Sequence, residues 1–152
     1  MHKIISGGQT GVDRAALDAA VDLGFEIGGW VPQNRWAEDG RISDDYPNLR
    51  ETDGEDPKLR TELNVRDSDA TLILSRGELR GGSKLTLEMA QKHGKPILHI
   101  DFEQFDLPFA VEKARSWLTK INYQTLNVAG PRASEDQQIY HKAKIFLTKL
   151  FA

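Results

Sequence analysis

The sequence contains no cysteine, only two methionines and no long apolar run. Without cysteine the chain can form no disulfide framework, no thiolate nucleophile and no cysteine-ligated zinc or iron–sulfur site, and this composition suits a reducing compartment. No apolar stretch approaches the roughly 20 residues that cross a bilayer, and the first residues lack the shape of a signal peptide. We therefore expect a cytoplasmic protein without a membrane partner.

An excess of positive charge is also lacking. The formal net charge is -3, whereas nucleic-acid-binding domains are usually basic with a clustered patch, so we expect no nucleic-acid partner. The four histidines stand at positions 2, 93, 99 and 141, without i, i+4 pairing or an H-E-x-x-H motif. We expect no metal site held by the protein, and we interpret His99, within an apolar strand, as structural.

The chain is long enough for one ordinary domain, spanning residues 1–152, that would bury about 70% of the surface of its unfolded form. Apolar runs typical of strands alternate with segments of helical spacing. The expected strands are residues 3–5, 25–31, 70–75, 97–101 and 123–128. The expected helices are residues 12–23, 57–66, 85–93, 106–118 and 134–150.

This alternation predicts an α/β fold with right-handed βαβ crossovers. The expected architecture is a Rossmann-like three-layer sandwich, in which a five-stranded parallel sheet lies between two helical layers. We expect the strand order 2-1-3-4-5, with 3-2-1-4-5 as the alternative. In either order the ligand site of such a sheet lies beyond the carboxyl ends of the strands.

A first glycine turn joins the opening strand to the first helix. Gly7, Gly8 and Gly11 let backbone N–H groups turn toward one point at a helix N-terminus, where the dipole favours an anion such as phosphate. Gln9 and Thr10 could donate to ligand oxygens, or could only cap the helix. The spacing matches neither G-x-G-x-x-G nor the P-loop motif, so a tight turn without a ligand remains the alternative.

Asp13 and Arg14 follow in the first helical turn. Arg14 is a candidate ligand-binding residue. The alternative is that both residues are surface groups, with Arg14 reaching Asp18 at i+4.

A second glycine turn follows the strand at residues 70–75. Gly81, Gly82 and Ser83 offer backbone amides and a hydroxyl, and Lys84 adds a positive charge that would suit an anion. In the order 2-1-3-4-5 the two turns follow neighbouring strands and converge on one crevice, whereas the alternative order separates them by a strand. Asn127 and Arg132 belong to the same edge of the sheet and are candidates for the pocket wall.

Residues 33–56 form an expected loop of about 24 residues, which is unusual in a compact domain unless it binds a ligand or is disordered. Its aromatic residues favour a binding loop, since disordered segments usually lack them. Trp30 or Trp36 could stack on a flat heterocycle, although core packing or a subunit contact is an equally common use of tryptophan.

Several motifs together resemble the family of molybdenum carrier proteins, relatives of the molybdenum cofactor carriers of algae and bacteria. The resemblance extends over most of the chain. It is carried by Ser6–Arg14 (SGGQTGVDR), Gly29–Pro32 (GWVP), Ala37–Gly40 (AEDG), Thr61, Asn64–Thr71 (NVRDSDAT), Gly81–Thr86 (GGSKLT) and Asn127–Arg132 (NVAGPR).

The resemblance implies a Rossmann-like fold of the lysine-decarboxylase-like (LOG-type) group, a homo-oligomer, either dimer or tetramer, and a pocket for a phosphorylated ligand. In that family the ligand would be the molybdenum cofactor (molybdopterin), a phosphorylated pterin whose dithiolene holds the metal, so the protein would need no cysteine. The leading hypothesis is therefore a carrier without enzymatic activity for this cofactor or for a related, still unknown, phosphorylated heterocycle.

The same group also implies an enzymatic alternative. Its phosphoribohydrolases, which release the base from a nucleoside monophosphate, carry a signature similar to P-G-G-x-G-T-x-x-E. Gly81, Gly82 and the glutamate Glu88 match it, but Arg80 replaces the proline and Lys84-Leu85 replace Gly-Thr. Glu88 would be the catalytic residue of such a hydrolase. A third hypothesis is a sensor of a nucleotide-derived signal, which the sequence does not separate from a carrier.

Overall fold

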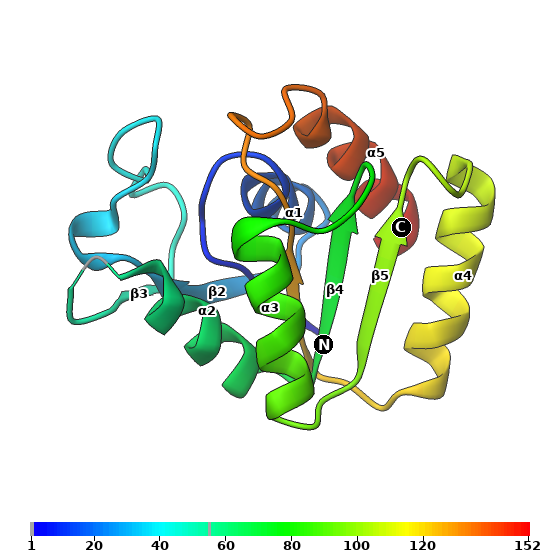
Figure 1. The fold of residues 1–152 in the computed structure, drawn as a ribbon, viewed down its shortest axis with the longest axis horizontal. Helices are drawn as coiled ribbons and strands as arrows, with labels where there is room; N and C mark the ends of the chain where they lie inside the picture. The colour runs from blue at the N-terminus through cyan, green and yellow to red at the C-terminus, as the bar shows by residue number, and fades with distance from the viewer. Residues whose placement is uncertain (1, 55) are drawn as a thin grey trace.

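The computed structural model describes residues 2–54 and 56–152, which form an α/β fold around a parallel sheet (Figure 1). The strands are β1 (Lys3–Ile5), β2 (Glu26–Val31), β3 (Leu49–Glu51), β4 (Ala70–Ser75), β5 (Ile97–Asp101) and β6 (Thr125–Ala129). The helices are α1 (Val12–Asp22), α2 (Pro57–Arg66), α3 (Gly81–Lys92), α4 (Leu107–Lys120) and α5 (Ile139–Phe151), with a short 3-10 helix at Gln33–Arg35.

Local signals start α2 and α4 where the sequence predicts, whereas α3 begins earlier than predicted, at Gly81, and α5 begins at Ile139 and not after a Ser134 cap. Asp56 accepts a hydrogen bond from the N–H of Lys58 ahead of α2, and Asp106 does the same for Phe109 ahead of α4. Both helices also have a proline in the first turn, where its missing N–H is harmless. The small apolar face of α1 is fully buried, so this helix lies close to the sheet.

The sheet has six strands in the order β3-β2-β1-β6-β4-β5, and every adjacent pair is parallel. Both predicted orders are wrong, because the last strand, β6, inserts between β1 and β4. The predicted number of strands is also wrong, because Leu49–Glu51, inside the predicted loop, pairs with the outer edge of β2. Apolar spacing identifies strands, but it does not say which pair, since backbone donors and acceptors are chemically alike in all of them.

The strand order becomes regular if the strands are numbered as in a circular chain, in which the C-terminal strand precedes the N-terminal one. If numbering starts at β6 and continues through β1, the order becomes 4-3-2-1-5-6, in which the winding direction reverses between β6 and β4. Such reversal points are where open α/β sheets bind ligands, beyond the carboxyl ends of the strands.

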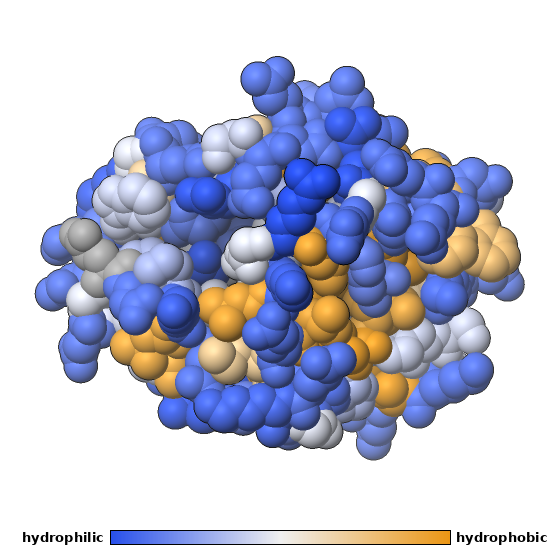
Figure 2. Space-filling model, in the orientation of Figure 1, coloured by the Kyte–Doolittle hydropathy of each residue, from blue (hydrophilic) through white to orange (hydrophobic). Residues whose placement is uncertain are grey.

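The helices cover the two faces of the sheet unequally. One face carries the main apolar core with α1, α4 and α5, and α2 packs against α3 on the other face. Figure 2 shows apolar residues at the surface over β4 and β5 beside α3, and hydrophilic residues around the N-terminal end of α3. The end of the sheet at which α3 begins is therefore the polar end.

In the part of the chain that the structure describes, no helix is both long and apolar enough to cross a membrane.

Candidate functional site

A cavity of about 260 Å³ opens at the carboxyl end of the sheet, next to the point where the winding reverses. It is bounded by the first glycine turn, the loop after β2, the first turns of α2 and α3 and the segment after β6. The lining residues are Gln9, Asp13, Pro32, Trp36, Pro57, Arg60, Thr61, Gly81, Gly82, Ser83, Thr86, Ala129, Gly130, Arg132 and Glu135.

Both glycine turns reach this cavity, although β6 separates the strands that carry them. Gly130, just beyond β6, explains how: a Cβ there would lie 2.3 Å from the carbonyl oxygen of Leu74, so only glycine lets the segment pass this close to β4. Of the predicted site residues, the cavity is lined by Gln9, Gly81, Gly82, Ser83 and Arg132. The adjacency of strands from which we predicted this convergence is wrong, but the two turns still share one cavity.

The N-terminus of α3 supplies the donors at one side of the cavity. The helix begins at Gly81, so Gly82, Ser83 and Lys84 belong to its first turn. The N–H groups of Ser83 and Lys84 donate to the carbonyl oxygen of Arg80, so the donors available to a ligand are those of Gly81 and Gly82, at the positive end of the helix dipole. A Cβ added at Gly82 would meet no atom within 4 Å, so this side of the cavity is open.

Other residues of the first glycine turn lie beside the cavity and hold its walls. A Cβ at Gly7 would lie 2.0 Å from Nη1 of Arg60, so the absent side chain makes room for that guanidinium. Gly8 faces Val31 and Ile42, away from the cavity.

Thr10 and Gly11 fasten the first turn to the segment after β6. Thr10 donates a hydrogen bond to Glu38 and accepts one from the N–H of Ala133. Gly11 approaches the carbonyl oxygen of Pro131, where a Cβ would stand 2.2 Å away. Both residues therefore position the walls of the cavity without lining it.

Arg14 also lies outside the cavity lining. Its guanidinium donates to the carbonyl oxygen of Gly8 and pairs with Asp39 at 3.0 Å. The predicted contact with Asp18 is absent among the hydrogen bonds and ion pairs of residues 2–54 and 56–152, because Asp18 instead accepts from the hydroxyls of Tyr46 and Tyr140.

Asn127, Lys84 and Glu88 are likewise placed away from the cavity. Asn127 is buried in β6, where its amide donates to the hydroxyl of Thr71 across the sheet. Lys84 and Glu88 are exposed and line an open hollow between α2 and α3, which adjoins the cavity and shares lining residues such as Arg60 and Gly81 with it. The candidate catalytic glutamate of the enzymatic alternative therefore faces solvent on that side of α3.

Two charged residues that the sequence analysis did not single out as ligand-binding also line the cavity. Asp13, which we considered a possible surface group, is only 4% exposed, and it accepts a hydrogen bond from the N–H of Gln9. Nη1 of Arg60, from α2, lies 3.7 Å from Oδ2 of Asp13. Nothing in the sequence pattern of α2 distinguishes Arg60 from its exposed neighbours, because the fold alone turns it toward the cavity.

The side chain of Arg60 is 16% exposed, and its guanidinium has unused hydrogen-bonding capacity. Within the described ranges it donates no hydrogen bond, and its Nε is buried without a partner. Burial lowers its pKa, partly offset by the carboxylate of Asp13. Since a guanidinium carries five N–H donors, Arg60 is suited to receive an anion that enters the cavity.

Burial raises the pKa of Asp13 to about 6, against the opposing effects of Arg60, the Gln9 N–H and Arg14; Glu135 adds a further small increase. The folded protein therefore binds a proton at Asp13 between about pH 4 and pH 6, where the unfolded chain has already lost it. This group's contribution to stability is present at low pH and lost as the pH rises through about 6.

We expect Asp13→Asn to gain stability relative to the unsubstituted protein as the pH rises, because asparagine avoids burying a charge. From pH 4 to pH 7 the difference in free energy of unfolding should shift in favour of the variant by about 2 kcal/mol. Urea unfolding at several pH values measures this difference. A difference that stays constant across this range would contradict the raised pKa.

The predicted binding loop, residues 33–56, is anchored to the cavity. The Glu38 carboxylate accepts hydrogen bonds from the Ser134 hydroxyl and from Thr10, and these bonds, the Ser134 bond foremost, lower its pKa. Arg35 is buried inside the loop and donates to the carbonyl oxygens of Ile42, Ser43 and Tyr46. Residues 33–54 of this loop are thus ordered, and they place the half-exposed side chain of Trp36 at the cavity.

No group of three or more histidine, aspartate or glutamate side chains arranged to hold a metal ion occurs in the described residues.

Comparison with known proteins identifies the family of the chain and a similar solved structure. A model of the circularly permutated YpsA SLOG family matches residues 4–151. The crystal structure of a "putative molybdenum carrier protein" from Syntrophus aciditrophicus SB has 48% sequence identity, covering 99% of this chain and 94% of that one, with a TM-score of 0.94. The cyclic reading of the strand order agrees with the permutation named in the family description.

A second solved structure is only distantly similar. The E-1-hydroxy-2-methyl-but-2-enyl-4-diphosphate reductase of Plasmodium falciparum has 12% identity over 92% of this chain and 50% of that chain, and its TM-score of 0.37 is too low to support a common fold. No curated protein matches the sequence.

Proposed function

The chain belongs to the circularly permutated YpsA SLOG family, and from this premise we propose that its cavity binds a small phosphorylated heterocycle, which the protein carries without transforming it. The resemblance to a protein named as a molybdenum carrier supports the molybdenum cofactor as cargo. The absence of cysteine is compatible with such a cargo, because its pterin dithiolene would hold the metal.

The proposal rests on Arg60, whose guanidinium has unused hydrogen-bond donors. Arg60 is largely buried and donates no hydrogen bond within residues 2–54 and 56–152, so an anion that accepts from it would satisfy donors that the fold leaves unpaired. The amides of Gly81 and Gly82 line the same cavity and add the positive end of a helix dipole. A phosphate between Arg60 and α3 would satisfy both sets of donors.

The acidic residues of the cavity do not cancel this positive potential. Glu135 is engaged by Arg132, whose Nε lies 3.1 Å from its carboxylate. Asp13 faces Arg60 at 3.7 Å and, because burial raises its pKa to about 6, it loses part of its charge in mildly acidic solution. Oε2 of Glu135 nevertheless lies 3.9 Å from the place of a Cβ at Gly81, so a bound anion would share the N-terminal end of α3 with this carboxylate.

We expect Gly82→Leu to weaken binding of a phosphorylated ligand at least tenfold, or about 1.4 kcal/mol. Its Cβ would project into open space, so the leucine would narrow the cavity without a clash, and replacing a helical glycine should stabilise α3 by about 0.5–1 kcal/mol. Calorimetric titration with GMP and with neopterin monophosphate measures the affinity.

Gln91→Leu, an exposed position on the same helix, serves as the matched control. Unchanged affinity in Gly82→Leu, together with binding by the control, would place the ligand elsewhere. Mass spectrometry of small molecules released from freshly purified protein would identify the ring of the natural ligand.

A further inference from the structure

The floor of the cavity holds a buried hydrogen-bond acceptor without a donor. Gln9 is 3% exposed, and its Nε2 donates to the carbonyl oxygen of Trp36 at 2.9 Å, which fixes the orientation of the amide. Its Oε1 has no hydrogen-bond partner among the described residues. A buried amide oxygen without a donor is unfavourable by about 1–3 kcal/mol, so a ligand that donates to it would gain that contribution.

A second acceptor lies next to Gln9. The carboxylate of Asp13 accepts one hydrogen bond in the described part of the chain, from the Gln9 N–H at 3.3 Å, and Arg60 stays 3.7 Å away. A carboxylate offers about four lone-pair sites, so most of its accepting capacity is unused. Because the Gln9 N–H binds Asp13 directly, the two side chains line neighbouring parts of the same wall.

An aromatic surface lies beside these acceptors. The indole of Trp36 lines the cavity and is 47% exposed, while its own backbone carbonyl is bonded to Gln9. Because Trp36, Gln9 and Asp13 line one cavity, a flat ring bound there can contact the indole and reach the two acceptors with its edge. Rings stack favourably on tryptophan, and only the chemistry of their edge would decide which ring is accepted.

We propose that Gln9 and Asp13 recognise a ring edge with adjacent N–H donors, so that the cavity selects phosphorylated 2-amino-4-oxo rings over rings that lack the amino group. This inference rests on the proposed function, because the phosphate must bind at Arg60 and α3. A carboxylate matches two parallel N–H donors, as it does in its pairing with arginine. Guanine and pterins share this edge, a ring N–H beside an exocyclic amino group.

The test compares ligands that differ in this edge alone. GMP and IMP differ by the exocyclic amino group, so GMP is expected to bind the full-length protein at least tenfold more tightly, or about 1.4 kcal/mol. Ribose 5-phosphate measures the contribution of the phosphate without a ring. The affinities of neopterin monophosphate and GMP, compared with each other, show whether the protein prefers a pterin or a guanine ring.

Variants connect the preference to the two residues. Asp13→Asn replaces two acceptors by one acceptor and one donor, and the ratio of GMP to IMP affinity should fall below threefold. The ratio is the readout because loss of the charge beside Arg60 would change binding of both nucleotides alike. Gln9→Met keeps the volume and removes the amide, and it should lower the same ratio. Asp44→Asn, at an exposed carboxylate, is the control and should leave the ratio unchanged.

The outcomes separate the two proposals. Equal binding of GMP and IMP, or a preference that survives both variants, would overturn recognition by Gln9 and Asp13 and leave the phosphate site standing. Failure of every phosphorylated compound to bind would overturn the phosphate site, and the recognition proposal with it. Thermal melting of each variant verifies that it is folded.

Discussion

Replacing Gly11 with alanine is expected to lower the free energy of unfolding by about 3 kcal/mol or more. Gly11 has φ 78° and ψ -128°, a conformation that residues with a Cβ rarely adopt. A Cβ there would also lie 2.2 Å from the carbonyl oxygen of Pro131 and 2.9 Å from the backbone carbon of Arg132. Both neighbours are backbone atoms, so no side-chain rotation relieves the clash.

Gly24→Ala is the matched control for this substitution. Gly24 has the same φ of +78°, but a Cβ there would meet nothing within 4 Å. Alanine should therefore be unfavourable by only about 1 kcal/mol, from the backbone conformation. Equilibrium unfolding in urea measures both variants, and similar losses in the two would show that the approach of Gly11 to Pro131 contributes little.

Replacing Arg60 with methionine is expected to weaken binding of GMP between about tenfold and a hundredfold, since a hydrogen bond to a charged group contributes about 1.5–3 kcal/mol. Arg60 is the cation with unused donors in the cavity, and its distance of 3.7 Å from Asp13 is too long for a hydrogen bond. Methionine preserves much of the apolar length of the side chain. Calorimetric titration measures the loss.

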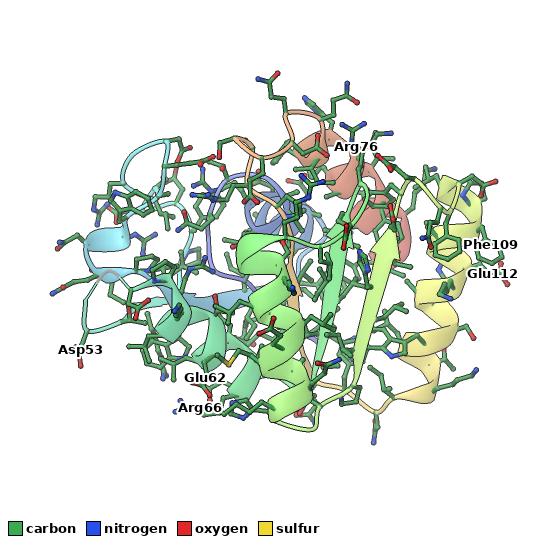
Figure 3. All side chains as sticks on the ribbon, in the orientation of Figure 1. Asp53, Glu62, Arg66, Arg76, Phe109 and Glu112 are labelled. Carbon is green, nitrogen blue, oxygen red and sulfur yellow. The ribbon has the colours of Figure 1, made fainter. Side chains whose placement is uncertain are left out.

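The control is Arg66→Met, which removes the same charge from the same helix. Arg66 lies at the C-terminal end of α2 near Glu62 (Figure 3), where it pairs with the adjacent Asp67 and is exposed. Its replacement should change GMP affinity less than twofold. Equal losses in the two variants would indicate a long-range charge effect, whereas a loss confined to Arg60→Met would support a direct contact.

Arg60→Lys refines the interpretation. Lysine keeps the positive charge but replaces the planar fork of donors by a single ammonium group. An affinity between those of the unsubstituted protein and Arg60→Met is expected if the guanidinium binds the anion through two parallel N–H groups. Full affinity in Arg60→Lys would show that the charge alone suffices.

Local patterns in the sequence determined the elements of this protein. Apolar spacing, capping residues and prolines located the five main strands and the helices, because these signals act between residues close together in the chain. The glycine turns were found for the same reason: glycine between a strand and a helix has a local meaning. The family was also accessible from the sequence, since its motifs occur in continuous stretches such as Ser6–Arg14.

The tertiary structure alone decided how these elements combine. The position of β6 between β1 and β4 depends on pairing over the whole chain, and strand propensity contains no information about the partner. The short strand β3 exists because β2 offers it an edge, without any apolar pattern of its own.

Tertiary packing also decided which charged residues line the cavity. Asp13 and Arg60 are 47 positions apart, and each looks like an ordinary charged residue of a helix. Their burial side by side follows from packing the start of α1 against α2 and the strand ends. The sequence by itself determined which segments can present amides to an anion, whereas burial in the folded chain decided which charges accompany them, because desolvation depends on every neighbour in space.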